Sequence, residues 1–383
     1  MHNKFLFTLL AAFFLVSCNS GLHLRERVTI DADYPLHPFQ FGTFCDRSGH
    51  EYLYFANLDY NYEINIYDSM YHHVRKIKLE IPGGEYTFYG CLVKSMDTIL
   101  VLSNPYKNNR LLYFDSLGHC YRTVFLNRDV VAGNNLFNYH FQSNSLSGNT
   151  HTSGDYLYLF MDFRESYDEK QTPRPSAAYK KYYYRHRYKT PYILKINLKN
   201  PNEYNFGYQG LQYGGHLCDT GECIGSRLFI SCANHKVFAW FESSDKLFVC
   251  NENMEIEREI TVMSRKTSIG RMPYKPEEKI NIYGYGRIYY VFFDQNKHLY
   301  YLIVRHNLSF EDNTYVSYYD GAPFSILVYD EQFNKKGEKR IRSDKYDYLY
   351  TFLTKKGLCL VKTSKSSDYD PKKIRFDAYR IGK

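Results

Sequence analysis

The residues best suited to chemistry lie in one short stretch, Tyr179–Tyr192, which reads YKKYYYRHRYKTPY. Six tyrosines are interleaved there with basic side chains, and no acidic residue occurs among them. Tyrosine rings can stack on sugar faces, and guanidinium groups bind carboxylates and phosphates through paired hydrogen bonds. We therefore predict a site for a glycan, a polyanion or an acidic partner; the alternative is a solvated loop whose tyrosines pack on neighbouring segments. The residues predicted to bind are Tyr179, Lys180, Lys181, Tyr182, Tyr183, Tyr184, Arg185 and Arg187.

Catalytic signatures are absent from the sequence. It contains no phosphate-binding loop, no GxSxG nucleophile elbow and no HExxH zinc motif. His140, His151 and His216 could ligate a metal but are widely separated in the sequence, so we expect no metal site and no cofactor. Two carboxylates from any two segments can still form a glycosidase site, so a hydrolase or lyase acting on glycans stays open as an alternative.

The cysteine pattern bears on the cellular compartment of the protein more than on any catalytic chemistry. No CxxC pair occurs, which argues against zinc ribbons and thioredoxin-like redox motifs. Cys218 and Cys223 frame the turn DTGE and are candidates for a small disulfide loop in an oxidising compartment. Cys232, Cys250 and Cys359 lie in apolar runs, where we expect buried free thiols.

The N-terminus reads as a secretory signal over residues 1–17. Lys4 precedes the apolar run Phe5–Val16, which is shorter than the about 20 residues that a spanning helix needs. Leu15-Val16-Ser17-Cys18 resembles a bacterial lipobox, which implies cleavage before Cys18 and lipid on that residue; the alternative is an ordinary signal with a chance cysteine. Several acyl chains anchor a protein stably, since each buried CH₂ contributes about 0.8 kcal/mol.

The expected location is the outer membrane, on its periplasmic side. An aspartate directly after the lipidated cysteine resembles a signal for inner-membrane retention, and an acidic run resembles a signal for surface export. Neither feature follows Cys18. We expect a lipidated tether with a possible ring-closing strand over residues 18–30, and a single folded unit over 31–383. Nucleic acid is not an expected partner in this compartment.

Composition excludes two broad classes. The chain of 383 residues carries a formal net charge of +8 and is 44% hydrophobic and 18% aromatic, which is too hydrophobic for a disordered chain. Only the N-terminal segment could enter a membrane, so a polytopic membrane protein is excluded. Short runs rich in Tyr, Phe, Ile and Val alternate with turns, which predicts an all-β protein.

A repeated hairpin underlies these strands. Asp68, Asp115 and Asn251 each follow an apolar strand and each stand seven residues before an arginine; Asp330 begins a fourth, longer copy. We interpret the pattern as an apolar strand, a turn capped by the Asp or Asn side chain, and a more polar returning strand.

The repeats indicate a six-bladed β-propeller of four-stranded antiparallel blades. A strand over Arg27–Ile30 is expected to complete the last blade and close the ring. A pair of β-sandwiches is the alternative fold. The six predicted units are 50–84, 95–127, 154–208, 225–263, 284–342 and 346–381.

A lipobox followed by six such units, with strand endings such as Ile64-Asn65-Ile66-Tyr67-Asp68, resembles the six-bladed, TolB-like propeller lipoproteins of Bacteroidetes. The resemblance covers nearly the whole mature chain and implies an architecture, with no catalytic residues to carry over. Asp followed by Ser or Thr and an apolar residue also resembles the Bacteroidetes O-glycosylation pattern. It predicts modification at Ser69, Thr98 or Ser116.

The leading functional hypothesis is a non-catalytic binding or scaffold module, anchored to the outer membrane by its N-terminal lipid. Its partner would be an envelope protein or a glycan recognised by one face of the propeller, because loops on a propeller vary without changing the scaffold. The rival is the propeller hydrolase or lyase, and a third reading is a sensory lipoprotein.

Overall fold

A computed structural model describes the chain as an all-β ring. The part of the chain that it describes contains strands, turns and bends but no helix, and so no helix that could cross a membrane. The described residues are 22–31, 40–58, 61–82, 88–103, 110–126, 137–141, 152–165, 193–200, 204–207, 228–241, 244–269, 286–307, 322–342 and 344–381.

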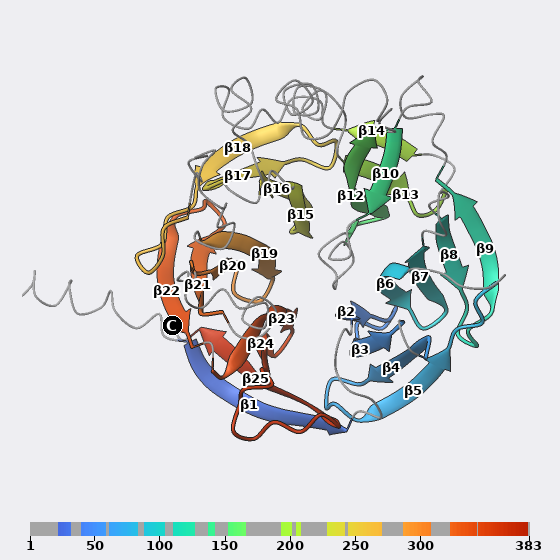
Figure 1. The fold of residues 1–383 in the computed structure, drawn as a ribbon, viewed down its shortest axis with the longest axis horizontal. Helices are drawn as coiled ribbons and strands as arrows, with labels where there is room; N and C mark the ends of the chain where they lie inside the picture. Colours follow the sequence, from blue (N-terminus) through green and yellow to red (C-terminus); the bar gives the residue numbers. More distant parts are fainter. Residues whose placement is uncertain are drawn as a thin grey trace, which may run out of the picture.

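Six antiparallel sheets stand around a central axis, and each is a blade of a β-propeller (Figure 1). In each of the first five blades the strands follow one another from the axis to the rim. Blade 1 comprises β2 (Gln40–Cys45), β3 (Glu51–Asn57), β4 (Glu63–Tyr67) and β5 (His73–Lys78). Blade 2 comprises β6 (Phe88–Ser95), β7 (Thr98–Ser103), β8 (Arg110–Phe114) and β9 (Cys120–Phe125).

The third blade carries a short extra strand. It comprises β10 (Phe137–Phe141), β11 (Thr152–Ser153), β12 (Tyr156–Glu165), β13 (Ile193–Asn197) and β14 (Tyr204–Gly207), with both β10 and β11 paired to β12. Blade 4 comprises β15 (Leu228–Ala233), β16 (Lys236–Phe241), β17 (Lys246–Cys250) and β18 (Ile256–Thr261). Blade 5 comprises β19 (Arg287–Asp294), β20 (Leu299–Arg305), β21 (Phe324–Asp330) and β22 (Lys335–Ile341).

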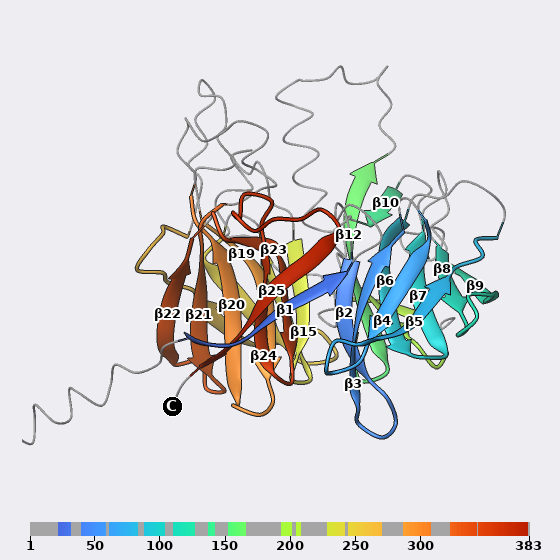
Figure 2. The ribbon, with the colours of Figure 1, turned by 90° about the horizontal axis from the view of Figure 1, so that it is seen from below.

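The two ends of the chain close the ring in blade 6. The inner strands are β23 (Tyr346–Thr354), β24 (Gly357–Lys362) and β25 (Lys373–Ile381), and the outermost is β1 (Leu22–Asp31). β1 pairs antiparallel with β25, with Leu22 opposite Ile381 and Val28 opposite Phe376. The strand expected over Arg27–Ile30 lies inside β1, where the closing pairing satisfies an otherwise exposed sheet edge (Figure 2).

The six-bladed prediction is confirmed, but the first three predicted units begin too late. They omit the innermost strands β2, β6 and β10. The units were drawn from capped hairpins, which lie toward the rim. Strand β2 reads QFGTFC and has four consecutive buried residues, so it lacks the alternation that marks a strand with one exposed face.

Buried aromatic side chains join neighbouring blades. The Trp240 indole donates to the carbonyl of Ile288 over 2.8 Å, which ties blade 4 to blade 5. The Tyr158 hydroxyl donates to the Glu252 carbonyl over 2.7 Å, from blade 3 to blade 4. Such rings fill the space between sheets while their polar atoms satisfy backbone groups across the interface, which explains the abundance of tyrosine.

The predicted hairpin caps are confirmed. Asp68 Oδ1 accepts hydrogen bonds from the backbone N–H of Met70 at 2.8 Å and of His72 at 2.9 Å. Asp115 and Asn251 make the same pair of bonds to the residues two and four positions later. The backbone bonds from these caps lower the pKa of Asp68 and of Asp115, although partial burial opposes the shift.

Candidate functional site

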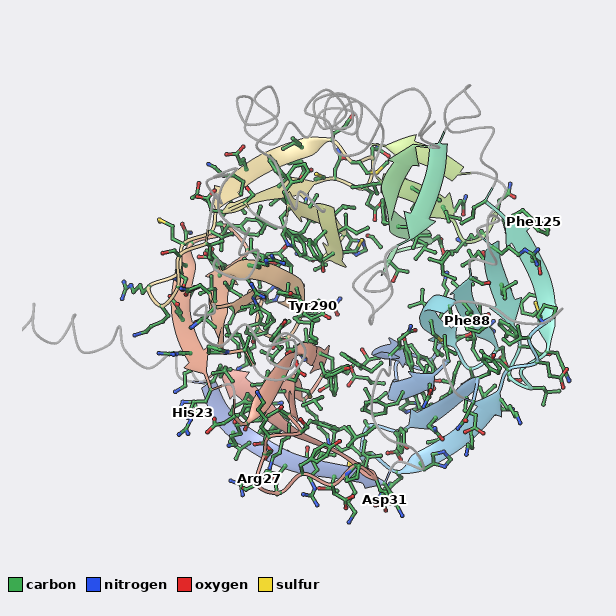
Figure 3. All side chains as sticks on the ribbon, in the orientation of Figure 1. His23, Arg27, Asp31, Phe88, Phe125 and Tyr290 are labelled. Carbon is green, nitrogen blue, oxygen red and sulfur yellow. The ribbon has the colours of Figure 1, made fainter. Side chains whose placement is uncertain are left out.

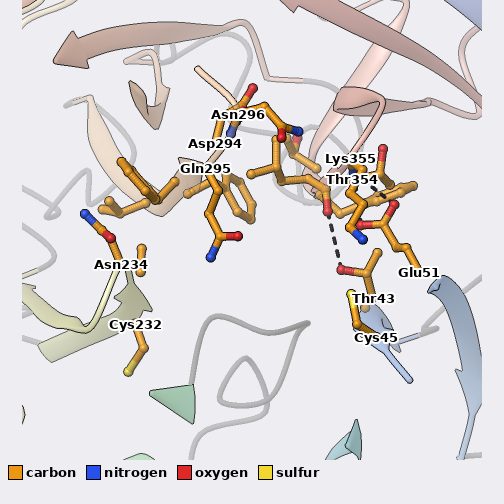
Figure 4. Close-up of a pocket in the computed structure, with 18 of the residues that line it drawn as sticks. Thr43, Cys45, Glu51, Cys232, Asn234, Asp294, Gln295, Asn296, Thr354 and Lys355 are labelled. Atoms are coloured by element: carbon orange, nitrogen blue, oxygen red, sulfur yellow. Dashed lines mark hydrogen bonds between the residues drawn. The ribbon is translucent and has the colours of Figure 1, made fainter. Parts of the chain in front are cut away.

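A cavity of about 310 Å³ opens at the axis of the ring, between the inner strands of blades 1, 4, 5 and 6. It lies where those strands end and turn into the second strand of each blade; we call these connections the inner turns. Aromatic side chains form part of its wall, and polar side chains converge from the four blades (Figure 4). The polar lining residues are Thr43, Cys45, Glu51, Asn234, Asp294, Gln295, Asn296, Thr351, Thr354 and Lys355.

Both carboxylates of the cavity hold inner turns in place. The Glu51 carboxylate accepts two hydrogen bonds from the backbone N–H of Lys355, at 3.0 and 2.9 Å, which joins blade 1 to blade 6. Burial raises the pKa of Glu51, and this backbone bond opposes the rise. Asp294 accepts from the backbone N–H of Asn296 at 3.0 Å and from the Tyr301 hydroxyl at 3.2 Å. These side chains therefore serve the architecture of the cavity.

Neutral amides face the cavity from two blades. Gln295 and Asn296 are exposed at the tip of the turn after β19. Asn234 and His235 form a two-residue hairpin turn with φ of 51° and 56°, a conformation that asparagine tolerates better than most residues. The Asn234 amide donates to the Tyr300 hydroxyl over 3.1 Å, which fixes its side chain.

A cysteine and a lysine stand at the edge shared by blades 1 and 6. Burial raises the pKa of the Cys45 thiol, although the Lys355 ammonium partly opposes this. A thiol with a raised pKa is a poor nucleophile at neutral pH. Lys355 donates through Nζ to the carbonyl of Gly49 over 2.5 Å, so its charge is used to join the two inner turns.

This arrangement fits recognition better than reaction. Amide, hydroxyl and phenyl groups together suit an uncharged polar ligand such as a sugar or an extended peptide. The Glu51 carboxylate is occupied by the inner turn of blade 6 and that of Asp294 by its own turn, and we find no nucleophile oriented by a base among the described lining residues. Nor do the described residues contain three His, Cys, Asp or Glu grouped as metal ligands.

Several sequence predictions fall outside the described residues. They are the binding stretch Tyr179–Tyr192, the lipidation site Cys18 and the candidate disulfide between Cys218 and Cys223. His151 and His216 also lie there, whereas His140 lies on β10.

Other predicted residues are placed by the structure. Cys232, Cys250 and Cys359 are buried and free, as expected, and burial raises the pKa of each thiol. Ser69 is exposed and Ser116 half-buried, each directly after a capping aspartate, while Thr98 is a half-buried residue at the start of β7. O-glycosylation at the three positions stays a prediction.

The cavity itself was missed by sequence reasoning, because four separate blades supply its wall. One signal was available. Asp46-Arg47-Ser48-Gly49-His50 and Asp294-Gln295-Asn296-Lys297-His298 repeat the Asp-to-His spacing of the capped turn at Asp68. Recognising these copies would have placed two inner turns at the same end of the ring.

No family model and no curated protein matches the chain. Solved structures do. A member of the DUF4221 family from Bacteroides vulgatus aligns with a TM-score of 0.71 at 19% identity, covering 95% of this chain and 99% of that one. The chain has the fold of Bacteroidetes propellers.

Two further structures align with TM-scores of 0.52. One, from Dyadobacter fermentans and of unknown function, has 9% identity and covers 94% of this chain and 100% of its own. The other, a Bacteroides fragilis protein provisionally named as exported, has 10% identity and covers 96% and 97%.

Proposed function

We propose that the protein is a non-catalytic binding module of the cell envelope that recognises an envelope protein or a glycan through its axial cavity. One observation carries the proposal: Glu51 and Asp294 are bonded to the backbone of inner turns, while the exposed amides of Gln295 and Asn296 line the cavity. Neutral donors and acceptors held on rigid strands discriminate between polar ligands without activating them.

The proposal includes an anchor, with lipid on Cys18 holding the module to the outer membrane on the periplasmic side. The lipobox-like sequence Leu15–Cys18 supports it, and so does the similarity to a Bacteroides fragilis protein provisionally named as exported. The aromatic and basic stretch Tyr179–Tyr192 connects β12 to β13 in the sequence, and we propose that it makes a second contact with the partner.

A glycan hydrolase or lyase is the second candidate. It is favoured by two carboxylates in one cavity and by the raised pKa of Glu51, since a general acid must stay protonated near neutral pH. A binding module predicts that Glu51→Gln and Asp294→Asn leave glycan binding measurable and that no product forms with the parent protein. Turnover that either substitution abolishes would favour the enzyme.

The binding proposal is tested with the unlipidated Cys18→Ser chain on a glycan array and on immobilised envelope extract. Asn234→Ala combined with Asn296→Ala should reduce capture at least tenfold, because both amides border the cavity. Lys266→Ala is the matched control, since Lys266 is exposed and does not line the cavity. Equal capture by all three proteins would contradict the proposal.

A further inference from the structure

The turns at the rim of the ring share one geometry but differ in one side chain. We call the connection between the third and fourth strand of a blade its outer turn. In the described outer turns of blades 1–5 an Asp or Asn caps the turn through its side chain. The third residue of the turn is Met70 in blade 1, Leu117 in blade 2, Lys199 in blade 3, Asn253 in blade 4 and Gln332 in blade 5.

The apolar side chains of blades 1 and 2 are not required by the turn. The cap binds the backbone of the third residue in blades 3 and 4 and of the fifth residue, Asn334, in blade 5, so a polar third residue is compatible with the turn in all three. Met70 and Leu117 are nevertheless 63% and 65% exposed, and Val74 and Tyr121 are exposed on the strands that follow. Exposed apolar groups that gather on one surface mark a contact with another apolar phase.

Cations lie beside these apolar side chains. A groove of about 540 Å³ runs between β5 and the outer turn of blade 2 and is lined by Arg75, Lys78 and Leu117. The end of β5 holds that turn through the N–H of Glu80, which donates to the Gly118 carbonyl over 2.8 Å. Glu80 is the acidic residue of the groove. The groove therefore places basic side chains next to an exposed apolar one; its third basic residue, Lys76, is paired with Glu63 over 3.1 Å.

The anchor proposed at Cys18 would join the ring at the start of β1 in blade 6, at the same end of the ring as the outer turns. The other end of β1 reaches blade 1, where the Tyr67 hydroxyl donates to the Asp31 carbonyl over 3.5 Å. Blade 6 has no outer turn, because the start of β1 and the end of β25 meet at that position, with Leu22 opposite Ile381. Only three residues lie between Cys18 and Leu22, so a lipid on Cys18 would be attached at most about 15 Å from the strand.

From Leu22, β1 runs along the rim toward blade 1, with His23 at its beginning and Asp31 at its end (Figure 3). Leu24 is 41% exposed on this strand, and Arg25 and Arg27 are exposed. The rim from the attachment point to blade 1 thus repeats the combination of apolar and basic side chains.

We propose that the docking arc, defined as β1 with the outer turns of blades 1 and 2, lies on the phospholipid surface that holds the anchor. Leu24, Met70 and Leu117 enter the interfacial region, while Arg25, Arg27, Arg75 and Lys78 contact the phosphates of anionic lipids. The inference rests on the anchor of the proposed function. Because inner and outer turns fall at the same end of each antiparallel blade, docking also holds the axial cavity close to the membrane.

The arc is tested with single tryptophan reporters in the lipidated protein, reconstituted in vesicles of phosphatidylethanolamine and phosphatidylglycerol with brominated acyl chains. The chain has one tryptophan, Trp240, which is 1% exposed and gives a constant background. Met70→Trp and Leu117→Trp should be quenched at least threefold more than Ile256→Trp. Ile256 is the matched control because it is 45% exposed on β18, in blade 4 across the ring.

Equal quenching at the three positions would overturn the arc, because it would mean that the ring tumbles freely on its tether. Incorporation of labelled palmitate, with Cys18→Ser as its control, reports on the anchor separately from docking, and cavity binding is measured without vesicles. A glycan on Ser69 or Ser116, found by mass spectrometry, would also overturn the arc, since sugars there would hold Met70 and Leu117 away from the bilayer.

Discussion

Two sets of turns at the same end of the ring use one cap for different purposes. The inner turn Asp294–His298 contributes to the wall of the axial cavity, and the inner turn Asp46–His50 lies between two lining residues, Cys45 and Glu51. The outer turns Asp68–His72 and Asp115–His119 lie at the rim. In all four the aspartate accepts a hydrogen bond from the N–H two residues later, at 2.8 to 3.0 Å. Three of the turns also share a left-handed fourth residue, at Gly49, Tyr71 and Gly118, whereas in the Asp294 turn the left-handed residue is the fifth, His298.

The difference is the third residue. It is Ser48 or Asn296 at the inner turns and Met70 or Leu117 at the outer turns. Since the cap fixes only backbone atoms, this position is free to carry whatever its surroundings require. The comparison teaches that the capped turn positions its third residue without needing that residue's side chain for stability. Side chains at this position can therefore serve recognition.

The largest expected effect is a difference in stability between a glycine substitution in an outer turn and one in an inner turn. Gly118 in an outer turn has φ of +89°, and an added Cβ would lie 2.0 Å from the Lys78 carbonyl oxygen. Gly118→Ala should therefore destabilise the protein by about 2–4 kcal/mol. Gly49 in an inner turn has φ of +80° with no atom within 4 Å of that position, so Gly49→Ala should cost only about 1 kcal/mol. Urea unfolding measures both, and equal losses would contradict the contact between β5 and the outer turn.

A second prediction contrasts the exposed turn histidines with a buried one. His306 is 3% exposed and lies 2.8 Å from the Ser325 hydroxyl; burial, assisted by the Arg340 charge, lowers its pKa to about 4. The unfolded chain, with a histidine pKa of about 6.5, then binds more protons, so stability should fall between pH 6.5 and 4 by about 2–3 kcal/mol.

The pH effect is checked by urea unfolding at pH 7.5, 6.0 and 4.5. His306→Gln should flatten the profile above pH 4.5. His72→Gln, at an outer turn where the imidazole is exposed, is the control and should keep the parent's slope. A parent-like slope in His306→Gln would show that another group is responsible.

The third prediction tests whether the caps are equivalent. Asp68→Ala and Asp294→Ala each remove an acceptor of backbone N–H groups and should each cost about 1 kcal/mol. Asp68→Asn should cost much less, because Asn251 makes the same bonds in blade 4. A large loss in the asparagine variant would mean that charge, not hydrogen bonding, stabilises these turns. Thermal unfolding of these variants at pH 7 distinguishes stabilisation by charge from stabilisation by hydrogen bonding.

The smallest expected effect concerns the third residues. Met70→Ser and Asn296→Ala should each change stability by less than about 0.5 kcal/mol, since both side chains are exposed and outside the cap. The first should alter only membrane contact and the second only capture of the partner. A stability loss above 1 kcal/mol in either variant would contradict the inference that the third side chain does not stabilise the turn.

Much of the scaffold could be read from sequence because its signals are local. The Asp-to-Arg spacing at Asp68, Asp115 and Asn251 marks a hairpin within about ten residues. Together with the longer copy at Asp330 and degenerate copies at Ile196–Leu198 and Ala378–Arg380, it indicates six units. The closing strand within β1 followed from the need to pair the last sheet edge. The inner strands β2 and β6 escaped notice because burial on both faces removes the alternating pattern.

The site could not be predicted in the same way. Thr43, Asn234, Asn296 and Thr354 are far apart in the chain, and only ring closure brings them to one cavity. The residues chosen by composition, Tyr179–Arg187, form a conspicuous run but lie outside the described residues. Composition reports unusual stretches, whereas a cavity built from ordinary turn residues carries no compositional signal.

Site-specific photo-crosslinking in intact cells tests the central claim most directly. A benzophenone amino acid is placed at the third residue of an inner turn, Asn296, and of an outer turn, Met70, in the full-length protein. We predict that the probe at Asn296 captures an envelope protein or glycan, while the probe at Met70 captures phospholipid. Capture of the same protein from both positions, or of nothing from Asn296, would contradict the account.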